Sequence, residues 1–326
     1  MHKIIILAVT CFPIILEPIA AADQAQPKVA IRLSPVPLWP QNNDTSQLPK
    51  AQFVFLSLST GEFVISYPKD LSASDDSERV TLRFGTHSLV DPQVTAHVTL
   101  GQDGTFTYAY QISNGVNARQ PVAKITLLIP TEDSEAEAHH PTWKIERPKS
   151  ASLRDLESPT RPVAPVEWSA ETSQPIQPGG SATGFSMNSK YRPGFTQVIL
   201  KGRTTKGEYT SEIAATLPQP VRDQVDKVLT PAWDSQTRLV LGPQFPKDAS
   251  QLDIAQNLLY GISVLSRHGD LSPDSSFVKG AISTLRAHLE SGSVTSLDAS
   301  RMTFLSNAKP GLEAEIANAL QVDFQQ

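Results

Sequence analysis

The sequence predicts an antiparallel, immunoglobulin-like β-sandwich followed by a small α-helical bundle. Three observations lead to this fold class. Apolar residues recur at every second position over much of 23–215, glycine- and proline-containing turns separate these stretches, and from about residue 216 the apolar spacing changes to every third or fourth residue. The first spacing is that of a strand with one apolar face, and the second is that of an amphipathic helix. We therefore assign residues 23–215 to a β-sandwich domain and residues 216–326 to a C-terminal helical domain.

Residues 1–22 have the features of a secretory signal peptide. Lys3 precedes an apolar run over residues 4–16, and three alanines at 20–22 offer small side chains for cleavage. Glu17 ends the run before it reaches the roughly 20 apolar residues that a membrane-spanning helix needs. The sequence therefore predicts an exported chain, periplasmic or extracellular, without a transmembrane helix after cleavage.

The single cysteine, Cys11, lies inside this segment. Lipid modification of Cys11 is an alternative to plain cleavage. Thr10 does not favour it, because such sites have a small residue immediately before the cysteine. After cleavage the chain would contain no cysteine, which excludes disulfides, thiolate metal sites and thiol catalysis. The net charge of -5 provides no long-range attraction for nucleic acid, so nucleic acid is not an expected partner.

The strands of the predicted sandwich follow from the alternation and from the turns between them. About eight strands are expected, at residues 53–58, 63–67, 80–84, 94–100, 106–112, 122–129, 182–187 and 196–201. Gly101–Gly104 is a hairpin turn, and Pro178-Gly179 is typical of a type II turn, of a kind that is common in immunoglobulin-like extracellular domains. Two packed sheets are the usual solution for such a series of short strands.

Between residues 131 and 174 the alternation is lost, although 143–145 and 166–168 still have the character of short strands. The helical region begins with a short helix after Pro220. Longer helices are predicted at 250–268, ended by Gly269, and at 277–289. Ser296 would cap a third helix, residues 312–320 mark a fourth, and the short links between them predict antiparallel packing.

No catalytic motif is found along the chain. Ser276 and Lys279 match the Ser-x-x-Lys spacing of penicillin-binding enzymes, but the Lys-Thr-Gly partner of that motif is absent. Residues 277 and 278 have the character of a helix core instead, with Ser275 or Ser276 as the N-cap. The sequence therefore predicts a protein that is not an enzyme and needs no cofactor. A hydrolase whose site is assembled from distant loops remains an alternative.

One loop contains residue types that bind metal ions. Glu135, Glu137, His139 and His140 lie within six residues, and imidazole with carboxylate suits zinc or a harder divalent ion. The alternative is a solvated acidic loop, because neighbouring histidines in a loop are not preorganised for a metal ion.

The tryptophans provide the candidate ligand site. Trp143 and Trp168 lie near prolines in predicted loops or short strands, where exposed rings would form a platform for a sugar or a protein. The alternative, which the sequence favours, is that these rings fill the ends of the sandwich, since burial of a tryptophan is worth a few kcal/mol.

Together these features predict an exported, non-enzymatic interaction protein. Its expected partner is another protein or a component of the cell envelope. A carbohydrate-binding β-sandwich module that uses Trp143 and Trp168 is the main alternative.

Overall fold

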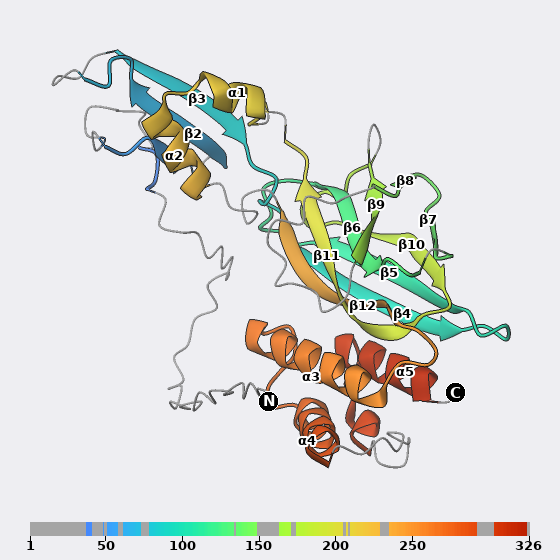
Figure 1. Cartoon of the computed structure of the whole chain (residues 1–326). Coiled ribbons are helices and arrows are strands. Elements are labelled where there is room, and N and C mark those ends of the chain that lie inside the picture. Colours follow the sequence, from blue (N-terminus) through green and yellow to red (C-terminus); the bar gives the residue numbers. More distant parts are fainter. Residues whose placement is uncertain are drawn as a thin grey trace, which may run out of the picture. The chain divides into compact units, whose positions relative to one another are not determined.

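The computed structural model describes residues 37–40, 48, 51–57, 61–72, 78–133, 135–148, 163–170, 174–204, 207, 209–228, 235–291 and 303–324. The predicted signal peptide, with Cys11, and the predicted cap at Ser296 lie outside these residues. The described chain consists mainly of antiparallel β-sheet, with helices concentrated towards the C-terminus (Figure 1).

The strands are β1 (Val54–Ser57), β2 (Glu62–Pro68), β3 (Arg79–Gly85), β4 (Pro92–Leu100), β5 (Phe106–Asn114), β6 (Val122–Pro130), β7 (Glu137–His139), β8 (Lys144–Glu146), β9 (Val163–Ser169), β10 (Ser181–Ser189), β11 (Arg192–Gly202) and β12 (Gln236–Phe245). The helices are α1 (Ser211–Thr216), α2 (Gln219–Val228), α3 (Gln251–His268), α4 (Ser276–Ser291) and α5 (Leu312–Phe324), with a short 3-10 helix at Thr303–Asn307. Every strand that the alternation predicts is therefore present, as are the helices predicted at 250–268, 277–289 and 312–320.

The first three strands form a sheet of their own, in the order β1-β2-β3. One face packs against α2, where Val221 and Val225 are fully buried among Phe53, Phe63 and neighbouring side chains. This core takes side chains from both sides of residue 216, because α2 belongs to the predicted helical region. The domain boundaries themselves stay a prediction.

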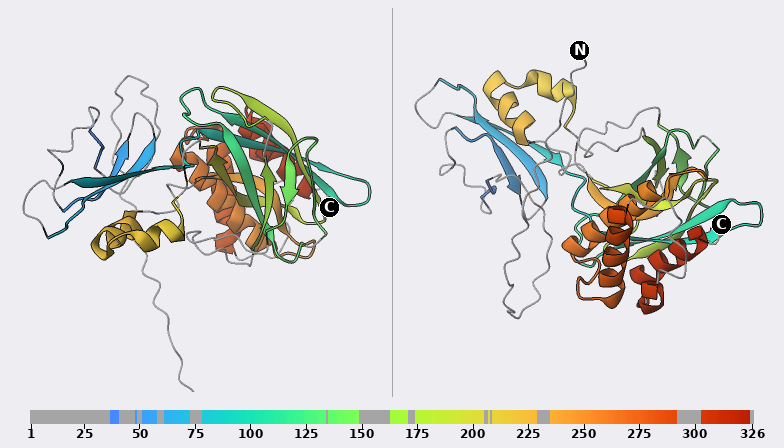
Figure 2. Two further views of the ribbon diagram at one scale, coloured as in Figure 1. Left: turned by 90° about the horizontal axis from the view of Figure 1, so that it is seen from above. Right: turned by 60° about the horizontal axis from the view of Figure 1, so that its bottom comes forward.

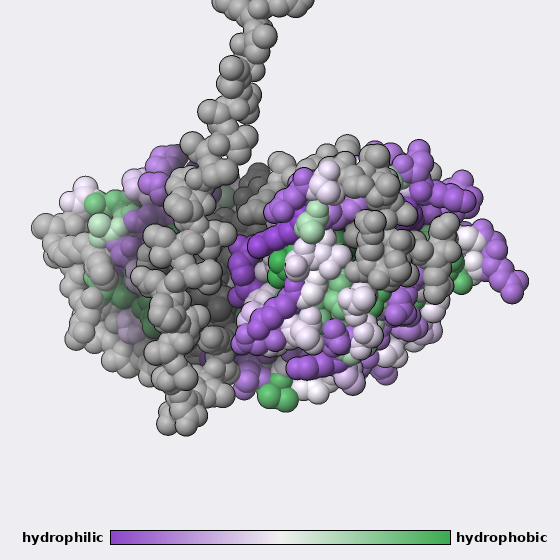
Figure 3. Space-filling view, turned by 90° about the horizontal axis from the view of Figure 1, so that it is seen from below, coloured by the Kyte–Doolittle hydropathy of each residue, from purple (hydrophilic) through white to green (hydrophobic). Residues whose placement is uncertain are grey.

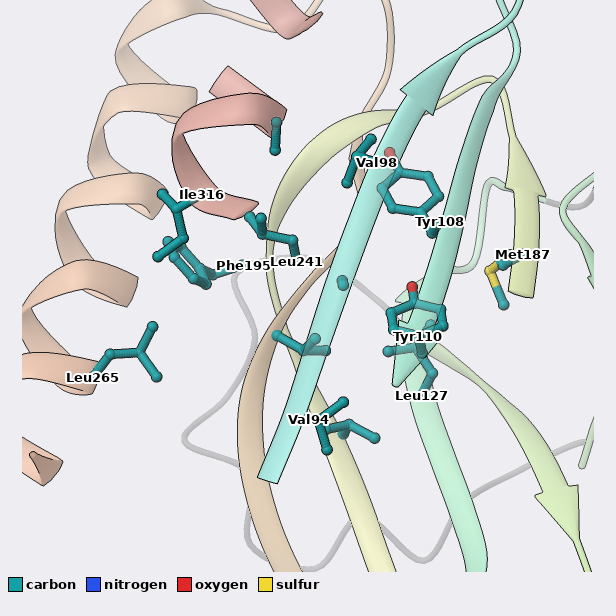
Figure 4. Packing of buried hydrophobic residues seen from close by; sticks show 14 of the residues in the cluster. Val94, Val98, Tyr108, Tyr110, Leu127, Met187, Phe195, Leu241, Leu265 and Ile316 are labelled. Carbon is teal, nitrogen blue, oxygen red and sulfur yellow. The ribbon is translucent and has the colours of Figure 1, made fainter. Parts of the chain in front are cut away.

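The other strands form a four-stranded sheet, β4-β5-β10-β7, and a five-stranded sheet, β12-β11-β6-β9-β8. Side chains from both sheets meet in one hydrophobic core, in which the rings of Tyr110 and Trp168 lie 6.1 Å apart. Figure 4 shows Val94 and Tyr110 of the four-stranded sheet in this core, close to Leu127 of the five-stranded sheet. In β4 and β5 every second side chain enters this core, as the alternation in the sequence requires.

The C-terminal helices extend the same core. α3 runs alongside β11 and β12 (Figures 1 and 2), and Asn257 joins this helix to β11. Its amide oxygen accepts from the backbone N–H of Phe195 at 2.7 Å, and its amide nitrogen donates to the C=O of the same residue at 3.0 Å. Gly269 ends α3 in a left-handed conformation with φ of 84°, which confirms the predicted stop.

Strand β12 lies inside the region 216–326, which the sequence predicts to be helical, so that prediction is wrong for residues 236–245. The strand pairs antiparallel with β11 along its whole length. Residues 240–243 are buried one after another, so both faces of the strand are covered here. A strand of that kind has a continuous apolar run rather than an alternation, and its periodicity does not reveal it.

The outer edge of β4 is covered by side chains instead of another strand. Arg238 on β12 donates from Nε to the C=O of Pro92 at 2.9 Å, and Asn318 on α5 donates to the C=O of Val98, also at 2.9 Å. A third contact joins the same strand to α5, where Nδ1 of His97 lies 2.9 Å from a carboxylate oxygen of Glu315. Such caps satisfy carbonyl groups that would otherwise be open to pairing with another chain.

Candidate interaction faces

The two tryptophans that the sequence singles out are part of the hydrophobic core. Trp143 is 5% exposed and Trp168 is 1% exposed. The Phe185 ring lies 4.9 Å from the first and 6.1 Å from the second, in edge-on contacts. Neither ring offers a face to solvent, so the exposed aromatic platform that we considered is not formed by these residues. They fill the core, which is the alternative that the sequence favours.

His140 closes the turn between β7 and β8. Its Nδ1 accepts hydrogen bonds from the backbone N–H groups of Thr142 and Trp143, at 3.1 and 2.9 Å, and its ring lies 4.2 Å from that of Phe185. The register of β10 is irregular just before Phe185, where Gly184 has φ of 94° and approaches the imidazole. Burial lowers the pKa of His140, and a hydrogen bond to the backbone of Thr183 offsets this in part. The neutral imidazole is therefore the form that stabilises this turn.

The candidate metal ligands do not converge. Glu135 pairs with Lys190 at 2.8 Å, whereas Glu137 lies 3.8 Å from His139, and His140 is turned towards the core. Within the part of the chain that the structure describes, no three His, Cys, Asp or Glu side chains are grouped as metal ligands would be. The structure thus brings together only Glu137 and His139 out of the four predicted residues.

The outward side of the four-stranded sheet is polar and almost without charge. We call the outward side of β4, β5 and β10 the uncharged face: Gln93, Thr95, His97 and Thr99 of β4, Thr107, Ala109, Gln111 and Ser113 of β5, and Ser186 and Asn188 of β10. Glu137 and His139 of β7 lie at its edge. The residues between them on each strand point into the core. Thr107 donates a hydrogen bond to the amide oxygen of Asn188 at 2.8 Å, across two paired strands.

The outward side of the five-stranded sheet is instead ordered by charge. Strand pairing places Lys201, Lys124, Ser169 and Lys144 in one line across β11, β6, β9 and β8, which we call the basic row. A second line lies two positions further along each of these strands. It consists of Ile199, Thr126, Glu167 and Glu146, and we call it the acidic row. Because residues two apart on a strand point the same way, both rows lie on one face, which we call the charged face.

Ion pairs join the two rows. Lys124 lies 2.9 Å from Glu167, and Lys144 lies 2.7 Å from Glu146. The hydrogen bond and the positive charge of Lys144 hold the pKa of Glu146 below its ordinary value, and Lys124 adds to the effect. The side chains of Lys124, Lys144 and Glu146 are 41%, 51% and 44% exposed, so their charged ends remain within reach of a partner, whereas Glu167 and Thr126 are buried.

The charged face could not be recognised along the sequence. Its residues come in pairs two positions apart, such as Lys124 with Thr126 and Lys144 with Glu146, and this is the ordinary pattern of an outward strand face. The rows arise only when β11, β6, β9 and β8 lie side by side, in an order that differs from their order along the chain. Figure 3 shows the surface of the molecule from below, where hydrophilic side chains separate small apolar areas.

No protein-family model matches this chain, and no curated protein does. Among the helices that the structure describes, none combines the length and the apolar character needed to cross a membrane.

Proposed function

We propose that this chain is an exported, non-enzymatic protein that binds another protein through its charged face. The observation that carries the proposal is the pair of rows, in which the ammonium groups of Lys124 and Lys144 and the carboxylate of Glu146 are partly exposed. A face that alternates in charge favours a partner with the opposite order and repels one with the same order. Such a pattern supports selection of one partner more than it supports tight binding.

Export is supported by the sequence of residues 1–22, and the compartment we propose is periplasmic or extracellular. We further propose that the four- and five-stranded sheets form an immunoglobulin-like β-sandwich, which their shared hydrophobic core supports. Contacts between α3 and α4, and between Phe277 and Phe304 with ring centres 5.7 Å apart, support a small helical bundle beside it.

Photo-crosslinking in the cells that make the protein tests the proposed function. A photoreactive residue replaces Lys144 on the charged face or, as the control, Gln111 on the uncharged face. We expect a recurrent crosslinked protein from position 144 and a weaker or different pattern from position 111. Equal patterns from the two positions, or no product from position 144, would contradict the proposal.

Carbohydrate binding is the second candidate function, and the uncharged face is the observation that favours it. Amide and hydroxyl groups both donate and accept hydrogen bonds, as the hydroxyls of a neutral glycan require. A glycan array with the full chain, the double variant Gln93→Ala/Gln111→Ala and the charged-face control Lys144→Glu tests it. Binding that the double variant loses and the control keeps is the expected result. Binding that is the same in all three chains, or no binding, would dismiss this site.

A further inference from the structure

We infer that the protein bound by the charged face is a second copy of this chain, so that the protein forms a two-fold symmetric dimer through this face. The inference rests on the proposed function and names its partner. It follows from the order of the charges across the sheet and from the symmetry that a dimer of identical chains adopts.

The two rows can face each other across a two-fold axis. They run parallel across the sheet and are separated by two residues along each strand, about 7 Å. A two-fold axis parallel to the rows and midway between them exchanges the basic row of one copy with the acidic row of the other. Each residue then faces the residue two positions away on the same strand of the second copy, which is the arrangement of an isologous interface.

The resulting contacts bring no two like charges together. On β8, Lys144 faces Glu146 of the second copy, and symmetry forms this pair twice. On β9, Ser169 faces Glu167, whose side chain is 11% exposed and already paired with Lys124, so this position adds no like-charge contact. The lysines of β11 and β6 face Ile199 and Thr126, which are uncharged.

A partner whose charges are all of one sign fits the same face less well. Exposed lysines and exposed glutamate lie within one row spacing of each other, so a polyanion attracted by Lys124 or Lys144 would be repelled by Glu146. A second copy provides both signs in the required order. Exposed ion pairs are individually weak and are screened by salt, so we expect a dimer that dissociates as the ionic strength rises.

Two complementary charge reversals test the dimer. Lys144→Glu places two acids at positions 144 and 146, and Glu146→Lys places two bases there. Each variant alone then opposes like charges at both symmetric contacts, and we expect its dimer dissociation constant to rise at least about tenfold. When the two variants are mixed, every contact again joins an acid with a base, so a mixed dimer should form.

Sedimentation of the full chain at low and high salt provides the readout. The exchanged variant Lys144→Glu/Glu146→Lys should dimerise like the wild type, because it restores the pair within each copy and between copies. Lys190→Glu is the matched control, since Lys190 also has an exposed pair, with Glu135 at 2.8 Å, but lies outside the charged face. It should leave the dimer unchanged.

Three results would overturn the inference: a wild-type chain that stays monomeric at low salt, single variants that dimerise like the wild type, or a mixture of the two that stays monomeric. The proposed function is tested separately. If position 144 crosslinks to a different protein while the chain is monomeric, the dimer is wrong and binding through the charged face stands. If position 144 gives no crosslink, both proposals fall.

Discussion

Substitution of Gly261 by alanine tests how α3 is fixed to the five-stranded sheet. A Cβ atom added at this position would lie 2.0 Å from Cδ2, 2.2 Å from Cγ and 2.6 Å from Cε2 of Phe195. The Phe195 residue is 4% exposed, and Asn257 binds both its backbone N–H and its C=O. The ring therefore has little freedom to move away from the added methyl group.

Two opposite effects determine the size of the change. Alanine in place of glycine inside a helix stabilises the helix by about 1 kcal/mol. Overpacking of a core costs about 1–3 kcal/mol, and the contacts at Gly261 are roughly 1.5 Å shorter than carbon atoms normally allow. Taking the upper end of the overpacking range, we expect Gly261→Ala to lower the free energy of unfolding by about 2 kcal/mol.

Urea unfolding followed by tryptophan fluorescence measures this change. The control is the same substitution in a Phe195→Ala background, where the obstructing ring is absent. There Gly261→Ala should stabilise the protein by about 1 kcal/mol through helix propensity alone. A single variant that is as stable as the wild type, or more stable, would refute the proposed contact between α3 and β11.

Two further predictions concern pH. Burial raises the pKa of Asp133, and its hydrogen bond from Ser189 offsets this in part, so the folded state binds the proton more tightly than the unfolded state. The stability that this group contributes is complete below the ordinary pKa of 3.8 and is lost as the pH rises through the raised pKa. The free energy of unfolding of the wild type relative to Asp133→Asn should therefore fall as the pH rises, and a difference independent of pH would contradict this. For His140 the pKa is lowered, so its effect on stability has the opposite pH dependence. The stability that it contributes is complete above the ordinary pKa of 6.5 and is lost as the pH falls below it. The destabilisation caused by His140→Ala should therefore be larger at about pH 8 than at about pH 5, and equal losses would show that its Nδ1 bonds do not matter.

The candidate site was less predictable from the sequence than the strands were. The lost alternation between residues 131 and 174 does not show whether Trp143 and Trp168 face solvent or the core. Their burial depends on Phe185, which is contributed by a strand that pairs with β5 and β7. Likewise, four potential metal ligands that are close in sequence are separated once β7 forms and Glu135 pairs with Lys190.

What can be read from the sequence alone is which side of an alternating strand or an amphipathic helix is apolar. Tyr108 and Tyr110 enter the core while Thr107 and Ala109 face outward, because successive side chains of a strand alternate by covalent geometry. The order of the strands is not local in this sense. It depends on contacts between residues far apart in the chain, and only the folded protein aligns lysines and glutamates from β6, β8 and β9 into the rows of the charged face.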